Sequence, residues 1–184
     1  MSQFPLRHRL FWAIRPTAPV DTQIGNFVEQ FAPGMPRVRN DRLHVTMAIT
    51  EDYPEEPTDL AATMREISDA IAARPFEMMV DRLAGSSGSV ALRPSRRVTG
   101  LYALHDQIMA VTRRAGLALR RQWHFNPHVT LFYRDGAPFT RDIAGFRWPV
   151  DELVLIHSVV GRTEHRPVGR WPLRGRDDPQ FSLF

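Results

Sequence analysis

The 184-residue sequence contains no cysteine and no lysine, and these two absences exclude several kinds of chemistry. Without cysteine there are no disulfides, no thiolate nucleophile and no cysteine-ligated zinc site. Without lysine there is no covalent lysine chemistry, so ligation through a nucleotidyl-lysine intermediate is excluded. All 24 basic residues are arginine, and any catalysis falls to histidine, carboxylates, hydroxyl groups and arginine.

The sequence also lacks a run of eighteen or more apolar residues, so no membrane-spanning helix is expected. The apolar stretch at residues 10–14 is too short for the core of a signal peptide, and a cytoplasmic location is expected. A hydrophobic fraction of 43% with 24% charged residues is typical of a globular protein. We expect a monomer with one domain over residues 1–184, in which residues 175–184 form a mobile tail.

The net charge of +4 is modest, but arginine supplies all of the positive charge. A guanidinium group keeps its charge and binds phosphate bidentately, so a cluster of arginines favours an anionic substrate. An ordinary solvated surface explains any single arginine equally well. The candidates in the middle of the chain are Arg93, Arg96, Arg97, Arg113, Arg114, Arg120 and Arg121.

The spacing of apolar residues predicts strands that alternate with helices. Short apolar or β-branched runs predict strands over residues 9–15, 43–50, 76–83, 89–92, 128–133, 152–160 and 165–173. Apolar residues at intervals of three and four predict helices over residues 19–31, 58–73 and 100–121. The Gly-Ser-Ser-Gly stretch at residues 85–88 predicts a hairpin turn.

Two copies of the tripeptide His-Val-Thr are the strongest functional signal. They stand at residues 44–46 and 128–130, 84 positions apart, each in a predicted strand. Because side chains alternate along a strand, the histidine and threonine of each copy point the same way while the neighbouring apolar residues point into the core. If the two strands are neighbours or near neighbours, two imidazoles and two hydroxyls meet on one concave face.

Such a face is suited to hydrolysing a cyclic phosphate. In-line attack needs a base on the entering water and an acid on the departing ribose oxygen, and an unperturbed histidine pKa of about 6.5 suits both roles. The threonine hydroxyls can hold the non-bridging oxygens. The sequence has no metal-binding motif such as His-Glu-x-x-His, so neither a metal nor a cofactor is predicted. A single His-x-Thr is common and usually has no function, but two copies in corresponding strands rarely arise by chance.

At these motifs the sequence resembles the 2′-5′ RNA ligase / RNA 2′,3′-cyclic phosphodiesterase family of the two-histidine phosphoesterase superfamily. The resemblance extends over most of the chain, through residues 9–16, 43–47, 125–131, 150–155 and 170–173. It implies a bilobal α+β fold in which each lobe is an antiparallel sheet flanked by helices, with a central cleft between the motif strands. The sequence departs at His157 and His165, where relatives often carry an arginine and an aromatic residue.

The resemblance also implies an activity, the metal-independent hydrolysis of a terminal RNA 2′,3′-cyclic phosphate to a 2′-phosphate. It assigns His128 and Thr130 to the water, and His44 and Thr46 to the departing 3′ oxygen. The same acid and base are compatible with weak 2′-5′ ligation in reverse. Expected partners are RNA 3′ ends with a cyclic phosphate or small cyclic nucleotides. Two alternatives stay open: a phosphodiesterase for a small nucleotide such as ADP-ribose cyclic phosphate, and a non-catalytic module that binds RNA 3′ ends.

Overall fold

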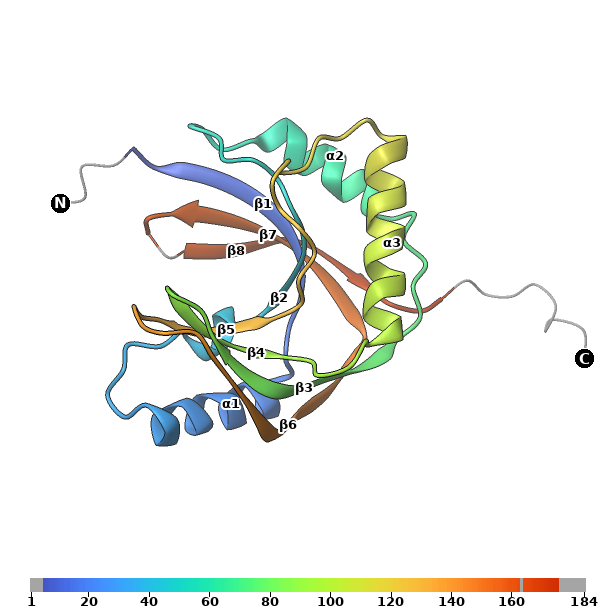
Figure 1. Ribbon diagram of the computed structural model, residues 1–184. Coiled ribbons are helices and arrows are strands. Elements are labelled where there is room, and N and C mark those ends of the chain that lie inside the picture. The colour runs from blue at the N-terminus through green and yellow to red at the C-terminus, as the bar shows by residue number, and fades with distance from the viewer. Residues whose placement is uncertain (1–4, 163, 176–184) are drawn as a thin grey trace, which may run out of the picture.

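The computed structural model describes residues 5–162 and 164–175, which form two four-stranded antiparallel sheets and three α-helices (Figure 1). The first sheet has the order β2 (Val45–Ile49), β1 (Arg7–Ile14), β7 (Glu152–Val160) and β8 (Glu164–Pro172). The second has the order β5 (Val129–Tyr133), β4 (Ser89–Arg93), β3 (Phe76–Gly85) and β6 (Phe139–Val150). The predicted α+β class, with two antiparallel sheets flanked by helices, is confirmed.

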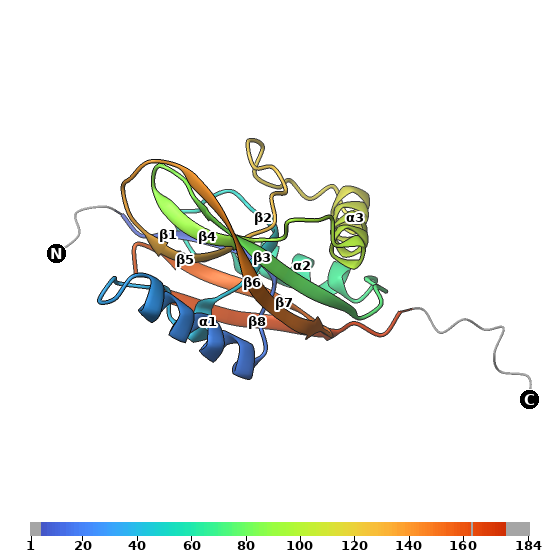
Figure 2. The ribbon, with the colours of Figure 1, turned by 60° about the horizontal axis from the view of Figure 1, so that its bottom comes forward.

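The helices pack on the outer sides of the two sheets. In Figure 1, α1 (Ala18–Phe31) lies below and α2 (Thr58–Ser68) and α3 (Thr99–Arg114) lie above, and Figure 2 shows α1 along the lower side again. Although α1 follows a strand of the first sheet, its Phe27 meets Phe146 of the second sheet edge-to-face at 5.6 Å. On the other side, Trp12 of β1 donates a buried 2.8 Å hydrogen bond to Ser68 of α2. The contact of Phe27 with Phe146 links the first sheet to the second.

Alternation along the strands divides the apolar side chains into two clusters. Val45, Met47, Val129 and Leu131 are fully buried in the main core, as the alternation of the two motifs predicts. A second, smaller cluster lies on the opposite face of the first sheet. Its buried members are Phe11, Ala13, Ile49, Val154 and Ile156, with Trp123 packed against them.

The predicted third helix is shorter than expected because a glycine ends it. It stops at Arg114, not at residue 121. Gly116 takes a φ of 64°, its N–H donates to the Arg113 carbonyl at 3.1 Å, and the Leu117 N–H donates to the Thr112 carbonyl at 2.9 Å. This pair of contacts is the Schellman motif, in which a left-handed glycine satisfies the last carbonyls of a helix. The second helix also ends early, at Ser68, whereas the first is confirmed.

Strand β6 has no counterpart in the prediction, because a bulge breaks its pattern. Its apolar side chains stand at odd positions first, at Phe139 and Ile143, and at even positions afterwards, at Trp148 and Val150. The change falls at Gly145, whose φ is 85°, and the pairing of β6 with β3 shifts register there. Three residues of β6 lie there opposite the single residue of β3 between Val80 and Arg82, so period-2 alternation does not extend over the length of β6.

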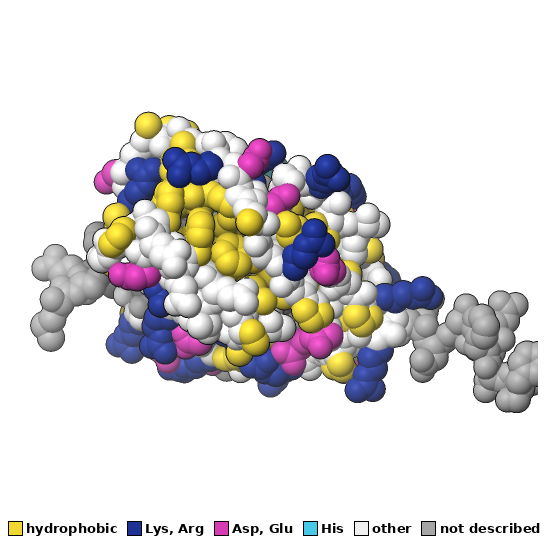
Figure 3. Space-filling view, turned by 90° about the horizontal axis from the view of Figure 1, so that it is seen from below, with side chains coloured by type: hydrophobic (Ala, Val, Ile, Leu, Met, Phe, Trp, Pro, Cys, Tyr) yellow, Lys and Arg dark blue, Asp and Glu magenta, His cyan; other side chains and the backbone are white. Residues whose placement is uncertain are grey.

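Part of the apolar surface of α1 and β6 remains open to solvent. A groove of about 300 Å³ between them is lined by Phe27, Ile143 and Phe146, among others. Figure 3, seen from below, shows hydrophobic side chains gathered near the middle of this view, with arginines and carboxylates around them.

Two expectations concern the ends and surroundings of the chain. The predicted mobile tail falls on residues 176–184, which lie outside the described residues, and of that tail only Gly175 is described. Among the described residues, no helix has both the length and the apolar character needed to cross a membrane.

Candidate active site

The two His-Val-Thr motifs stand where the edge strands of the two sheets begin. Since β2 starts at Val45 and β5 at Val129, each histidine lies one residue before its strand, not within it as predicted. The segment that leads into β2 also pairs with β5, because the Val38 N–H donates to the Leu131 carbonyl at 2.7 Å. This pairing holds the two edges together and brings the motifs into one region.

Both histidines are held by the same local contact. Nδ1 of His44 lies 2.6 Å from the Arg42 carbonyl oxygen, and Nδ1 of His128 lies 2.7 Å from the Asn126 carbonyl oxygen. A carbonyl oxygen only accepts, so each Nδ1 must carry the hydrogen and donate it. Nε2 is therefore the nitrogen that can take up or release a proton in both rings. The sequence offers no signal for this contact, because the backbone oxygen of any residue can make it.

Positive charges and burial act together on His44. The pKa of His44 is lowered to about 4, chiefly by burial. The contact with the Arg42 carbonyl opposes this effect, and the charges of His128, Arg15 and Arg42 add to it. The effect of His128 places the second imidazole within electrostatic range of the first. In the free protein His44 is therefore neutral at pH 7.

The hydroxyl of Thr46 lies on the same face of the first sheet as the ring of His44. Thr46 pairs with Ala13 of β1, and residues opposite one another in an antiparallel pair share a face. Ala13 belongs to the smaller apolar cluster together with Phe11, whose ring centroid is 4.9 Å from that of His44. The first motif thus presents one imidazole and one hydroxyl together, as predicted.

The second motif repeats this arrangement on the second sheet. Thr130 pairs with Ala91 of β4 and shares its face. Ala91 and His128 line one cavity of about 530 Å³, with Arg82 and Arg93 on the same wall. All four residues predicted for the site therefore stand at the two adjoining sheet edges.

The family follows from a match over most of the chain. Residues 19–162 match the model of the 2′-5′ RNA ligase superfamily. The chain belongs to the 2′-5′ RNA ligase superfamily. The resemblance seen in the sequence is confirmed, although no curated protein matches the sequence.

Solved structures agree with this assignment to the superfamily. E. coli LigT in its apo form superposes with a TM-score of 0.73 at 26% identity, over 91% of this chain and 98% of LigT. A crystal structure of a phosphoesterase gives a TM-score of 0.72 at 25% identity, over 91% of this chain and 99% of that one. E. coli LigT complexed with phosphate gives 0.70 at 25% identity, over 91% and 98%.

His165, one of the two departures from the superfamily's pattern, lies in the site. From β8 its ring meets His44 and Phe11 edge-to-face, both at 5.3 Å. Burial lowers the pKa of His165 to about 3, and the charges of His44, Arg42 and others act in the same direction. The sequence marks this position only as a departure, and nothing in it indicates contact with a motif residue 121 positions away.

His157, the other departure, turns away from the motifs. Its Nε2 lies 3.0 Å from Nδ1 of His8, and the two rings stack at 5.2 Å. It pairs with Leu10, whose side chain belongs to the main core and not to the smaller cluster beside His44. This histidine is therefore not among the residues that the fold brings to the site.

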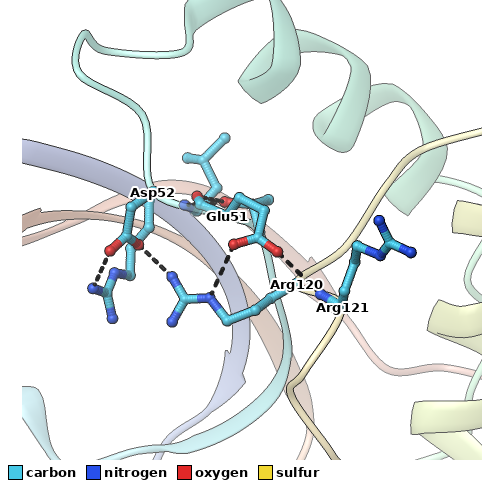
Figure 4. A network of polar contacts seen from close by, with 7 residues as sticks. Glu51, Asp52, Arg120 and Arg121 are labelled. Atoms are coloured by element: carbon cyan, nitrogen blue, oxygen red, sulfur yellow. Dashed lines mark hydrogen bonds and ion pairs between the residues drawn. The ribbon is translucent and has the colours of Figure 1, made fainter.

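The segment between α3 and the second motif is anchored on the first sheet by charged groups (Figure 4). Arg120 forms ion pairs with Glu51 and Asp52, and the Arg121 N–H donates to Glu51 at 3.0 Å. Asp52 also accepts a 2.8 Å bond from Arg9 of β1. Of the arginines suggested by the sequence for an anionic substrate, Arg120 thus has carboxylate partners within the fold.

Proposed function

We propose that this member of the superfamily hydrolyses the 2′,3′-cyclic phosphate at the 3′ end of RNA to a 2′-phosphate. The main support is the pair of imidazoles whose Nδ1 atoms are occupied alike by backbone carbonyls, at two sheet edges that are bonded together. Such a pair offers two Nε2 atoms for acid and base catalysis. E. coli LigT, which shares the fold, has been solved with phosphate, and this supports a substrate that contains phosphate.

In the proposed reaction, Nε2 of His128 accepts a proton from the attacking water while Nε2 of His44 donates one to the departing 3′ oxygen. The water oxygen bonds to phosphorus, the bond from phosphorus to the 3′ oxygen breaks, and a 2′-phosphomonoester with a free 3′-hydroxyl results. The hydroxyls of Thr46 and Thr130 donate to the non-bridging oxygens as charge builds there. Afterwards His128 carries the proton and His44 is neutral, so solvent resets the pair.

Positioning and two proton transfers can supply the catalysis without a metal, because the five-membered ring is already strained. Within the described ranges, no group of three or more histidine, aspartate or glutamate side chains is placed to hold a metal ion. Metal independence stays a prediction.

One assay tests the proposal directly. An oligonucleotide that ends in a 2′,3′-cyclic phosphate is incubated with the protein in EDTA, and the product is analysed by phosphorus NMR. We expect a 2′-phosphate. A 3′-phosphate would mean that the 2′ oxygen leaves, and tight binding without turnover would favour the non-catalytic module. Inactivation by EDTA that added metal reverses would overturn metal independence.

The low pKa of His44 predicts how activity depends on pH. The reactive free enzyme carries one proton on the pair, and a second proton removes the base. Because the pKa of His44 is lowered to about 4, this ring stays neutral until the pH falls to that value. We expect the acid limb of kcat/KM to fall about tenfold per pH unit below about pH 4. Circular dichroism over the same range controls for unfolding, and an acid limb near pH 6.5 would contradict the prediction.

A further inference from the structure

Two cavities on the second sheet are adjacent, because the same two arginines line both. The first, of about 530 Å³, contains His128 together with Arg82 and Arg93. The second, of about 350 Å³, contains Arg82 and Arg93 again and continues to Arg96 and Arg97 in the loop between β4 and α3. A path lined by arginine therefore leads away from the second motif.

Three of these arginines are free to meet an anion. Within residues 5–162 and 164–175, no ion pair joins Arg93, Arg96 or Arg97 to a carboxylate. Nε of Arg93 is buried and has no hydrogen-bond partner in the same ranges, which makes it a donor in need of an acceptor. Arg82, by contrast, already pairs with Asp142 at 3.1 Å.

The loop that carries these arginines is held in place by its neighbours. The carboxylate of Asp81 accepts two bonds from Ser95, one from its N–H at 2.7 Å and one from its hydroxyl at 2.6 Å. The guanidinium of Arg97 lies 3.7 Å from the centre of the Tyr102 ring. A guanidinium packed flat on a ring keeps its in-plane N–H groups available to phosphate oxygens. The carboxylate of Asp81 is thus bonded to Ser95 and does not neutralise the loop arginines, so the loop presents positive charge.

One residue connects this path to the second motif. The backbone carbonyl of Asn126 accepts from Nδ1 of His128, and its side-chain oxygen accepts from Arg93 at 2.7 Å. The position of Arg93 is therefore tied to that of the imidazole. An anion held by Arg93 and the loop arginines would lie at a fixed distance from a phosphate at His128.

We propose that Arg93, Arg96 and Arg97 bind the phosphodiester on the 5′ side of the ribose that carries the cyclic phosphate. The inference rests on the proposed function and names its substrate class, an RNA chain of two or more nucleotides. A nucleoside cyclic phosphate has only a hydroxyl at its 5′ position, so it leaves these arginines without a partner. A phosphodiester supplies two acceptor oxygens to a fork of donors.

The test compares two substrates that differ by one nucleotide. We measure kcat/KM for uridine 2′,3′-cyclic phosphate and for a dinucleotide that ends in the same group, with the wild-type protein, with Arg96→Ala/Arg97→Ala and with a charge-matched control, Arg65→Ala/Arg74→Ala. The control residues are exposed and line neither cavity. We expect the wild type to prefer the dinucleotide by about tenfold or more, a typical gain from charge-assisted bonds. The loop variant should lose most of this preference, and the control variant should keep it.

The dependence of kcat/KM on salt concentration is a second measurement, and partial unfolding of a variant would not change it in the expected way. Log kcat/KM for the dinucleotide should depend on log salt less steeply in the loop variant, by about 0.7 for one lost phosphate contact. Equal selectivity in all three proteins, or no wild-type preference, would overturn the inference and leave the proposed function intact. A third substrate, with a pyrophosphate on the same 5′ oxygen, identifies the source of the phosphate, because a preference for it alone would favour a small nucleotide over RNA. If the wild type turns over none of these substrates, the proposed function itself fails.

Discussion

His44→Ala and His128→Ala should each lower kcat/KM for cyclic-phosphate hydrolysis at least about a hundredfold, the usual loss when acid or base catalysis is removed. Each substitution deletes the Nε2 that the proposed reaction uses on that side of the phosphate. Both rings are only half-buried and precede their strands, so the fold should survive. Steady-state rates on one dinucleotide substrate, with thermal melts of each variant, provide the measurement.

Two control variants distinguish the loss of proton transfer from the loss of the contact that holds the side chain in place. His124→Ala removes an exposed histidine four residues before the second motif and should keep wild-type activity. His44→Asn leaves an amide N–H near the place of Nδ1, so it can still donate to the Arg42 carbonyl while it lacks Nε2. We expect His44→Asn to be as inactive as His44→Ala. Wild-type activity in His44→Asn would mean that His44 does not transfer a proton. The double variant should be little worse than either single one, because an acid and a base act as a unit.

Local patterns predicted those parts of the fold that local physics determines. The alternation in the two motifs placed Val45 and Val129 correctly in the core, because a strand has only two faces. Apolar spacing alone predicted that α3 continues to residue 121. In the structure α3 ends at Arg114, because Gly116 adopts a left-handed turn that apolar spacing does not reveal. The bulge at Gly145 hid β6 for a similar reason, because its extra residues are defined only by pairing with β3.

The candidate site divides in the same way between what the sequence shows and what only the fold reveals. His44 and His128 are recognisable because each carries its own threonine two residues later. His165 was not, because its contact with His44 depends on where β8 lies relative to β2, at the opposite edge of the sheet. The link from His128 through Asn126 to Arg93 uses one backbone and one side-chain oxygen, and no sequence spacing indicates it.

Replacing the departing 3′ oxygen by sulfur should restore about a hundredfold of the activity lost in His44→Ala and none of that lost in His128→Ala. A thiolate is a far more stable anion than an alkoxide and leaves without a proton, so a general acid becomes unnecessary while the base on the water is still needed. The measurement is kcat/KM for a uridine cyclic phosphate with sulfur at the 3′ position, in both variants and the wild type.

This substitution is needed because pH profiles do not assign the roles. The enzyme form with one proton on the pair has the same pH dependence whichever ring holds that proton. In the empty site the low pKa of His44 keeps this ring neutral, whereas a bound phosphate anion raises that pKa and lets His44 act as the acid. If sulfur restores activity to His128→Ala and not to His44→Ala, then His128 is the acid, and the neutral His44 is the base that takes the proton from water. Rescue of neither variant would mean that the leaving oxygen takes its proton from a group other than the two motif histidines.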